Sequence, residues 1–189
     1  MRLFIALEIP EPVRREVARR VAGLRERLPQ ARWVDPEIIH LTLVFLGEVA
    51  EEKVSALSAR LRETLAPYAP LPMRLSDAGT FPPGRPARVA WLGLEAPEEL
   101  QALQADAVRV AVETVGHEPE ERPYKPHVTL ARCPSPWKRD VIEKLVAAFP
   151  GTIGQPWIAD RVVLMESKLS PRGARYRVVE EHLLTGGEA

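Results

Sequence analysis

A four-residue pattern occurs twice in this chain, as His40-Leu41-Thr42-Leu43 and as His127-Val128-Thr129-Leu130. Because side chains alternate between the two faces of a β-strand, the histidine and threonine of each copy share one face and the apolar pair lies on the other. Each copy therefore presents an imidazole and a hydroxyl about 6.6 Å apart, at ~3.3 Å per residue. Two such strands facing one cleft would supply two proton-transfer groups and two hydroxyl donors. This arrangement suits acid–base chemistry on an oxyanion such as a phosphate.

The spacing of the two copies indicates an internal duplication. His40 and His127 are 87 positions apart, and at the same offset Ala6–Glu11 aligns with Gly93–Glu98 without a gap and with four identical residues. Two copies with so long a period do not fit a solenoid. We expect a single bilobal domain over residues 1–189, with a first repeat of about 1–84, a second of about 85–170, and a C-terminal strand hairpin of about 155–185.

Apolar periodicity predicts the same order of elements in each half: strand, helix, motif strand, helix, strand. We expect an α+β fold with two pseudo-symmetric lobes, each a mainly antiparallel curved sheet with helices packed outside, and an active-site cleft between the two sheets. The expected first-half elements are strand 2–9, helix 13–28, strand 38–47, helix 54–65 and strand 71–81. Those of the second half are strand 88–94, helix 98–115, strand 127–132, helix 141–149 and a long strand 155–167, followed by a final strand 175–184.

The composition narrows the compartment and the partners. Basic and acidic residues balance at 26 each, so no global positive charge favours nucleic acid. Five basic residues stand against one acid between Arg161 and Arg177, a stretch that would hold a phosphate backbone, although such runs are more often solvated faces. The single cysteine, Cys133, excludes an intramolecular disulfide and favours a reducing compartment. With no signal peptide and no apolar run near the roughly 20 residues of a membrane span, we expect a cytoplasmic protein, monomeric and without an obligate protein partner.

The amino-acid bias points to a thermophile. The chain has no Asn, 19 Pro, and 21 Arg against five Lys. Scarce amides, many charges and loop prolines are typical of thermophile proteins, and a GC-rich genome would produce the same bias.

Four further residues are candidates for substrate binding: Arg132, Lys125, Ser167 and Phe45. By strand alternation Arg132 falls on the face opposite the second histidine, so it reaches the cleft only if the strand ends or bends there; a surface ion pair explains it equally well. Lys125 lies two positions before that histidine and shares its parity. Ser167 is the repeat counterpart of Thr80, and the two are expected at the two edges of the cleft. Phe45 would stack on a base, although core packing is the commoner role of an aromatic in so apolar a strand.

The pattern does not predict a metal centre. Two histidines 87 positions apart, with no Asp, Glu or Cys at ligand spacing beside them, do not form a zinc site. We therefore expect neither a metal nor another cofactor.

Segments around and between the motifs carry a family resemblance. They are Arg2–Ala6, His40–Gly47, Phe81–Pro82, Arg88–Trp91, Pro126–Arg132 and Glu166–Pro171. Through them the chain resembles the two-histidine phosphoesterases, specifically the RNA 2′,3′-cyclic phosphodiesterase branch, historically called 2′-5′ RNA ligase. The resemblance covers nearly the whole chain, and no motif residue departs from it.

The resemblance implies a metal-independent enzyme that hydrolyses RNA 2′,3′-cyclic phosphate ends to 2′-phosphomonoesters, with weak 2′-5′ RNA ligase activity beside it. Its partner would be RNA with a 2′,3′-cyclic phosphate terminus. The resemblance assigns His40 as the proton donor and His127 as the proton acceptor, which the symmetry of the sequence leaves open. Thr42 and Thr129 would donate hydrogen bonds to the non-bridging phosphate oxygens, where negative charge concentrates in the transition state.

Three alternatives stay open. The first is the same chemistry on small cyclic nucleotides or 2′-5′ oligonucleotides. The second is a non-catalytic RNA-binding module of the same fold, although binding alone does not require two titrating groups. The third is a duplicated structural domain without a ligand, which leaves the paired threonines unexplained.

Overall fold

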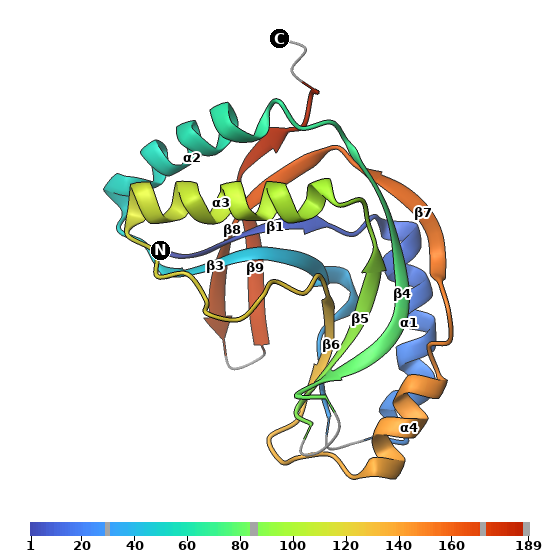
Figure 1. Ribbon diagram of the computed structural model, residues 1–189. Coiled ribbons are helices and arrows are strands. Elements are labelled where there is room, and N and C mark those ends of the chain that lie inside the picture. The colour runs from blue at the N-terminus through green and yellow to red at the C-terminus, as the bar shows by residue number, and fades with distance from the viewer. Residues whose placement is uncertain (29–30, 84–86, 171–172, 187–189) are drawn as a thin grey trace.

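The strands of the chain form one curled antiparallel sheet. The computed structural model describes residues 1–28, 31–83, 87–170 and 173–186. Its strands are β1 (Arg2–Glu8), β2 (Arg32–Trp33), β3 (His40–Glu48), β4 (Leu71–Phe81), β5 (Val89–Glu95), β6 (Val128–Arg132), β7 (Ile153–Ala159), β8 (Arg161–Ser170) and β9 (Gly173–Leu183). From edge to edge they run β7-β4-β5-β6-β3-β1-β8-β9, with the short β2 also paired to β6 (Figure 1).

The strand order has an approximate two-fold symmetry about the junction of β6 and β3. Moving outward, β6, β5 and β4 on one side match β3, β1 and β8 on the other, at the offset of the sequence repeat. The predicted α+β fold with a curved antiparallel sheet is confirmed. One detail is refined: the junction contains the ladder pair Leu41 with Val128, so the sheets of the two halves are continuous there. The division into repeats at about residue 84 stays a prediction.

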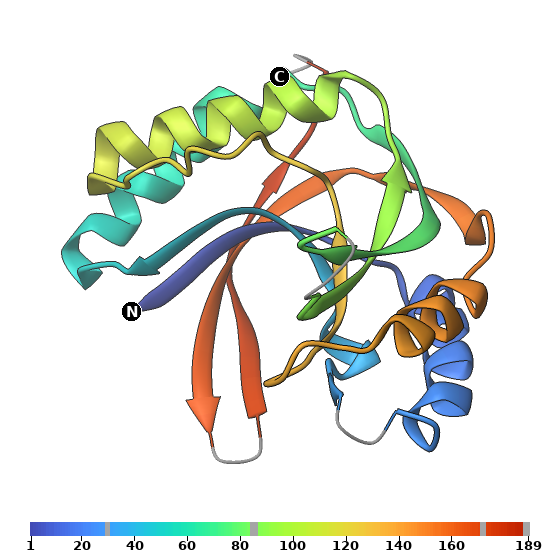
Figure 2. The same ribbon diagram turned by 60° about the horizontal axis from the view of Figure 1, so that its bottom comes forward.

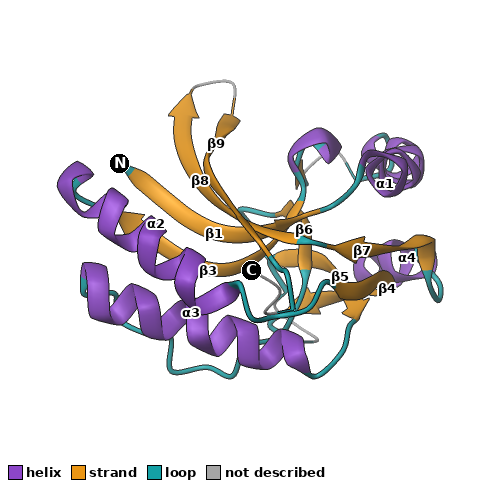
Figure 3. Cartoon of the chain, turned by 90° about the horizontal axis from the view of Figure 1, so that it is seen from above, coloured by secondary structure: helices purple, strands orange, loops and turns teal. Residues whose placement is uncertain are grey.

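Helices cover one face of the sheet in two pairs (Figures 1 and 3). They are α1 (Glu11–Arg25), α2 (Glu51–Leu65), α3 (Glu99–Val115) and α4 (Arg139–Ala147), with a short 3-10 turn, η1 (Pro36–Ile38). Helices α2 and α3 pack on β1, β3 and β8, and α1 and α4 pack on β4 to β7. The first helix of each repeat therefore covers mainly strands of the opposite half, which ties the halves together.

Apolar spacing explains how each helix finds its place. In α1, Val13, Val17, Val21 and Leu24 recur at steps of four and three and are buried, as an amphipathic helix requires. The odd-numbered residues of β1, Leu3, Ile5 and Leu7, join the core beneath α2 and α3. The even-numbered Phe4 and Ala6 face the other way and form a small cluster with Val163 and Met165 of β8. That second face carries the candidate site.

The predicted long strand 155–167 is wrong, because the chain there forms two strands at opposite sides of the sheet. Strand β7 pairs with β4 at one edge, and after Asp160 the chain enters β8, which pairs with β1. The backbone amide of Leu184 donates to the carbonyl of Asp160 at 2.8 Å, which holds this crossing point. No Gly or Pro lies between 157 and 167 to signal the break. Pro156 is tolerated in β7 because β7 is an edge strand.

Strands β8 and β9 pair along their length, from Arg161 with Leu183 to Ser170 with Gly173. Figure 2 shows this hairpin extending beyond the rest of the sheet. None of the described helices is long and apolar enough to cross a membrane. The expected monomeric state and cytoplasmic location stay predictions.

Candidate active site

The two motif strands meet at the centre of the sheet. Because β3 and β6 are antiparallel with Leu41 opposite Val128, the register places His40 opposite Thr129 and Thr42 opposite His127. The four polar side chains thus occupy the corners of one patch on the face away from the helices. Cross-strand neighbours have Cβ atoms ~5 Å apart and diagonal neighbours lie ~7–8 Å apart, which sets the scale of the separation between the two imidazoles.

Matching β-bulges in the two motif strands bring one further residue of each strand to this face. In β3, Ile5 pairs with Val44 and Ala6 with Thr42, so Leu43 is an extra residue. In β6, its repeat counterpart Leu130 is extra in the same way. A bulge shifts the alternation by one position, so the residue three after each threonine returns to the threonine's face. These residues are Phe45 in β3 and Arg132 in β6.

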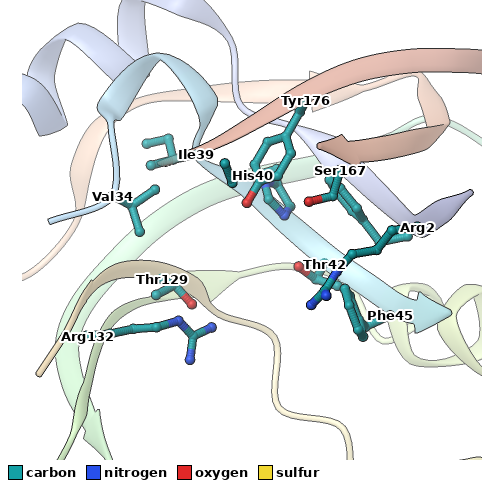
Figure 4. Close-up of a pocket in the computed structure, with 12 residues that line it drawn as sticks. Arg2, Val34, Ile39, His40, Thr42, Phe45, Thr129, Arg132, Ser167 and Tyr176 are labelled. Atoms are coloured by element: carbon teal, nitrogen blue, oxygen red, sulfur yellow. The ribbon is translucent and has the colours of Figure 1, made fainter. Parts of the chain in front are cut away.

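A cavity of about 400 Å³ opens beside the patch (Figure 4). It is lined by Arg2, Phe4, Val34, Ile39, His40, Thr42, Phe45, Thr129, Arg132, Ser167, Ala174 and Tyr176. Six of the predicted site residues are in this set: His40, Thr42, Thr129, Phe45, Arg132 and Ser167. The other two, His127 and Lys125, do not line the cavity and instead contact the rings of Phe81 and Trp91.

His40 is held between two aromatic rings. Its ring stacks on Phe4 with 4.7 Å between centroids, and Tyr176 meets it edge-on at 5.3 Å. Its Nδ1 lies 2.9 Å from the carbonyl oxygen of Ile38. Burial lowers the pKa of His40, and the hydrogen bond to the Ile38 carbonyl partly offsets that effect.

His127 has the corresponding contacts with different neighbours. Phe81 meets its ring edge-on at 5.0 Å and Trp91 at 6.4 Å. Its Nδ1 lies 2.7 Å from the carbonyl oxygen of Lys125. Burial is the main cause that lowers the pKa of His127, the hydrogen bond to this carbonyl raises it, and the positive charges of Arg132 and Lys125 lower it further.

The Nδ1 contacts determine which nitrogen of each ring is available for chemistry. A backbone carbonyl only accepts hydrogen bonds, so Nδ1 of His40 and of His127 must carry a proton and donate it. In the neutral imidazole Nε2 then holds the lone pair, and in the imidazolium Nε2 carries the second proton. Both rings therefore offer Nε2 as the atom that accepts or donates a proton.

Lys125 covers the aromatic group beside His127. Its Nζ lies 4.4 Å from the centre of the Trp91 ring and 5.6 Å from that of Phe81, a cation–π arrangement. The Trp91 ring in turn lies directly over Gly79 of β4, where an added Cβ would come within 2.3 Å of the ring carbons. Gly79 is therefore required for the Trp91 ring to lie flat against β4.

The backbone of the first motif is also tied to the segment that leads into the second. The Tyr124 hydroxyl donates a 3.0 Å hydrogen bond to the carbonyl of Thr42. Burial raises the pKa of Tyr124, so the phenol keeps this proton at neutral pH. The bond fixes the position of Thr42 relative to the approach of the chain to His127.

The expected edge pair of Ser167 and Thr80 is half right. Ser167 lines the cavity, whereas Thr80 does not. Phe4 pairs with Met165, while its repeat counterpart Trp91 pairs with Gly79, so the offset in these outer strands is 86 instead of 87. The structural counterpart of Ser167 is therefore Phe81, and Thr80 faces the other side.

The sequence reasoning missed Arg2, Phe4 and Tyr176 as cavity residues. Arg2 and Phe4 lie on the alternating face of β1 next to β3, and their parity with respect to the buried Leu3 and Ile5 was an available signal. Tyr176 comes from β9 and enters the site through the hairpin pairing of Ser167 with Tyr176. The hairpin itself is local, but no local pattern predicts its place near β3, because β1 must first insert between β3 and β8.

The basic stretch from Arg161 to Arg177 behaves largely as a charged surface. Arg161 forms ion pairs with Asp160 and Glu181, and both Lys168 and Arg177 pair with Glu166. Arg175 is exposed, and Arg172 lies outside the described residues. Among the described residues there is also no group of three or more His, Cys, Asp or Glu placed to hold a metal ion.

Comparison with known proteins finds relatives that match nearly the whole chain. The RNA 2′,3′-cyclic phosphodiesterase of Methanothermobacter thermautotrophicus is 34% identical over 180 residues, covering 95% of this chain and 97% of the relative. That of Thermus thermophilus is 35% identical over 197 residues, covering 98% and 91%. Both organisms are thermophiles, in agreement with the amino-acid bias.

Solved structures show the same fold. A crystal structure of a Thermus thermophilus protein matches with a TM-score of 0.81 at 32% identity over the whole of both chains. Escherichia coli LigT, crystallised with 3′-AMP, matches with a TM-score of 0.76 at 28% identity, covering 97% of this chain and 98% of LigT. The model of the 2′-5′ RNA ligase superfamily matches residues 10–170. The chain therefore belongs to the 2′-5′ RNA ligase superfamily.

Proposed function

We propose that this protein hydrolyses the 2′,3′-cyclic phosphate at the end of an RNA and leaves a 2′-phosphomonoester. The observation that carries the proposal is the patch at the β3–β6 junction, where two histidines and two threonines lie beside a cavity lined by arginines. Relatives that cover nearly the whole chain carry the name RNA 2′,3′-cyclic phosphodiesterase, which supports the same assignment.

The reaction needs one base and one acid. His127 accepts a proton from water at Nε2 as the water oxygen attacks phosphorus. The bond between phosphorus and the ribose 3′-oxygen breaks, and His40 donates its Nε2 proton to that oxygen. The phosphate stays on the 2′-oxygen, and each imidazole contributes about 10²- to 10⁴-fold.

The positive charges near His127 support its role as the base, and the cavity bears on the role of His40. Arg132 and Lys125 lower the pKa of His127, which favours the neutral form that a base requires. The cavity lies beside His40, where there is room for the ribose that carries the leaving oxygen. Water needs little room and approaches on the side of His127, next to Trp91 and Phe81.

The remaining polar groups stabilise charge on the phosphate. Thr42 and Thr129 donate hydrogen bonds to its non-bridging oxygens from the two strands. Arg132, brought round by the bulge in β6, supplies a guanidinium beside Thr129 (Figure 4). When an RNA 5′-hydroxyl attacks the cyclic phosphate in place of water and the 3′-oxygen leaves, a 2′-5′ linkage forms, and we expect this ligation to be weak.

The decisive experiment uses an oligonucleotide ending in a 2′,3′-cyclic phosphate, with EDTA present. The wild type should release a 2′-phosphate end, and His40→Ala and His127→Ala should each lose at least about 100-fold in kcat, the lower end of the range for general acid–base catalysis. Product analysis distinguishes 2′- from 3′-phosphate. A 3′-phosphate product would contradict the assigned leaving group, and loss of wild-type activity in EDTA would point to a metal mechanism.

A further inference from the structure

Arg2 lines the cavity, yet the reaction proposed above gives it no role. Its Nε is buried without a hydrogen-bond partner, and within the described part of the chain its guanidinium forms no ion pair. A cation held in a pocket without a partner costs free energy unless a ligand supplies the partner. By contrast, Arg161 and Arg177 on the outer hairpin already have carboxylate partners.

The charges in the cavity exceed what the cyclic phosphate can neutralise. Two arginines, Arg2 and Arg132, line it, and no aspartate or glutamate is among the lining residues. The cyclic phosphodiester carries one negative charge. The cavity is therefore suited to an anion with a second negative charge, placed away from the reacting phosphorus.

The geometry of Arg2 also suits its guanidinium to bind a phosphate. Its guanidinium carbon lies 5.1 Å from the centre of the Phe45 ring, and Phe45 is 46% exposed. Stacking on a ring leaves the N–H edge of a guanidinium available, and that edge matches two phosphate oxygens. Figure 4 shows Arg2 and Arg132 reaching the cavity from opposite sides.

We propose that Arg2 binds the phosphodiester that joins the terminal nucleotide of the RNA to the nucleotide before it. This inference rests on the proposed function, because it takes the cyclic phosphate to lie between His40 and His127. With that phosphate in place, the next phosphate along the RNA is one nucleotide away, on the side of the cavity where the nucleoside fits. Arg2 then selects an RNA end over a small nucleoside cyclic phosphate.

The test compares two substrates that share the reacting group. One is a nucleoside 2′,3′-cyclic phosphate with a free 5′-hydroxyl, and the other is the same nucleotide with a 5′-phosphodiester to one further nucleotide. Arg2→Gln should lower kcat/KM for the dinucleotide by about 10- to 100-fold, as expected for a lost charge-assisted hydrogen bond, and change that for the nucleoside by less than about twofold. Arg2→Lys should recover part of the loss, because lysine keeps the positive charge but lacks the paired N–H donors of the guanidinium.

Two controls keep this result specific. Arg175→Gln removes an exposed positive charge outside the cavity and should leave both substrates unaffected. Added salt should lower the preference of the wild type for the dinucleotide and have little effect on that of Arg2→Gln. A thermal unfolding curve for each variant shows whether β1 still folds.

The outcomes separate this inference from the proposed function. If the wild type hydrolyses neither substrate, the proposed function is wrong. Equal loss on both substrates would place Arg2 at the cyclic phosphate and overturn the inference alone. Unchanged activity on the dinucleotide would overturn it as well, while leaving the histidine chemistry intact.

Discussion

The two histidines occupy equivalent positions in a duplicated sheet but have different surroundings. His40 stacks on Phe4, meets Tyr176 edge-on and lies beside an open cavity. His127 packs against Trp91 and Phe81 and is not among the residues that line this cavity. A duplication alone would give two equal groups. The flanking strands make the two sides of the site different, with the cavity on the side of His40.

The largest expected effect distinguishes the roles of the two histidines by changing the leaving group of the substrate. In a nitrophenyl phosphodiester the nitrophenolate leaves without being protonated, so its departure does not require the acid. His40→Ala should lose at least about 100-fold in kcat/KM on the cyclic phosphate but under about tenfold on the nitrophenyl ester. His127→Ala should lose at least about 100-fold on both, because water still has to be deprotonated. The opposite pattern would exchange the two roles.

A smaller effect is expected from the packing beside His127. In Gly79→Ala the new Cβ would overlap the Trp91 ring, which must move, and we expect the free energy of unfolding to fall by about 1–3 kcal/mol. Since Trp91 contacts His127, kcat should fall as well. The matched control is Gly23→Ala in α1, where an added Cβ meets nothing within 4 Å and should raise stability by up to about 1 kcal/mol. Equal stability of the two variants would argue against the Trp91 contact.

These comparisons show which parts of the molecule the sequence predicts well. The paired motifs place His40 and His127 correctly on one face, and β4 and α3 match the predicted ranges closely, because strong apolar periodicity defines both. The bulges were harder to predict, because the cue for them is faint. Two adjacent apolar residues follow each threonine, Leu43-Val44 and Leu130-Ala131, and this repeated doublet was the available signal.

Contacts between strands far apart along the chain could not be predicted from the sequence, for a different reason. The break at Asp160 depends on which strands β7 and β8 join, and those partners lie far along the chain. Arg2 and Tyr176 reach the cavity only because β1 lies next to β3 and the β8–β9 hairpin lies next to β1. Local propensity carries no information about such neighbours, whereas the packing of the whole sheet determines them.

Besides burial, the cations Arg132 and Lys125 lower the pKa of His127, so removing one of them should change the pH profile of kcat/KM. Both histidines have pKa values lowered below ~6.5, so the protonated form of the acid disappears as the pH rises through that lowered pKa. The maximum of kcat/KM should therefore lie below pH ~6.5. In Lys125→Met one cation near His127 is gone, so the pKa of His127 rises and the acidic limb moves to higher pH.

Lys138→Met provides the control for this profile. Lys138 lies at the start of α4, and it is not among the charges that act on the pKa of His127. Its removal should leave the acidic limb in place. An unchanged limb in Lys125→Met would mean that burial and Arg132, without Lys125, lower the pKa of His127.

The smallest effect concerns a third histidine, in the outer strand of the His40 half. His182 of β9 is 1% exposed, neither ring nitrogen has a hydrogen-bond partner among the residues that the structure describes, and burial lowers its pKa. Arg62, on the packed helix α2, lowers this pKa as well, whereas Glu180 of β9 raises it. The folded protein therefore binds this proton less readily than the unfolded chain, whose histidine has a pKa near ~6.5. The stabilising contribution of neutral His182 is present above pH ~6.5 and is lost as the pH falls from there toward the folded value.

The variant His182→Leu isolates this contribution. The free energy of unfolding of the wild type should fall on acidification below pH ~6.5, by at most about 1.4 kcal/mol per pH unit for this group. In the variant, the free energy of unfolding should change with pH in this range only through His40 and His127. Hydrogen exchange gives the comparison between halves: acid should speed exchange in β9 before it does so in β7, the edge strand of the other half. Equal acceleration in the two edges would mean that His182 has no part in the acid response, because only the His40 half carries a buried histidine in its edge strand.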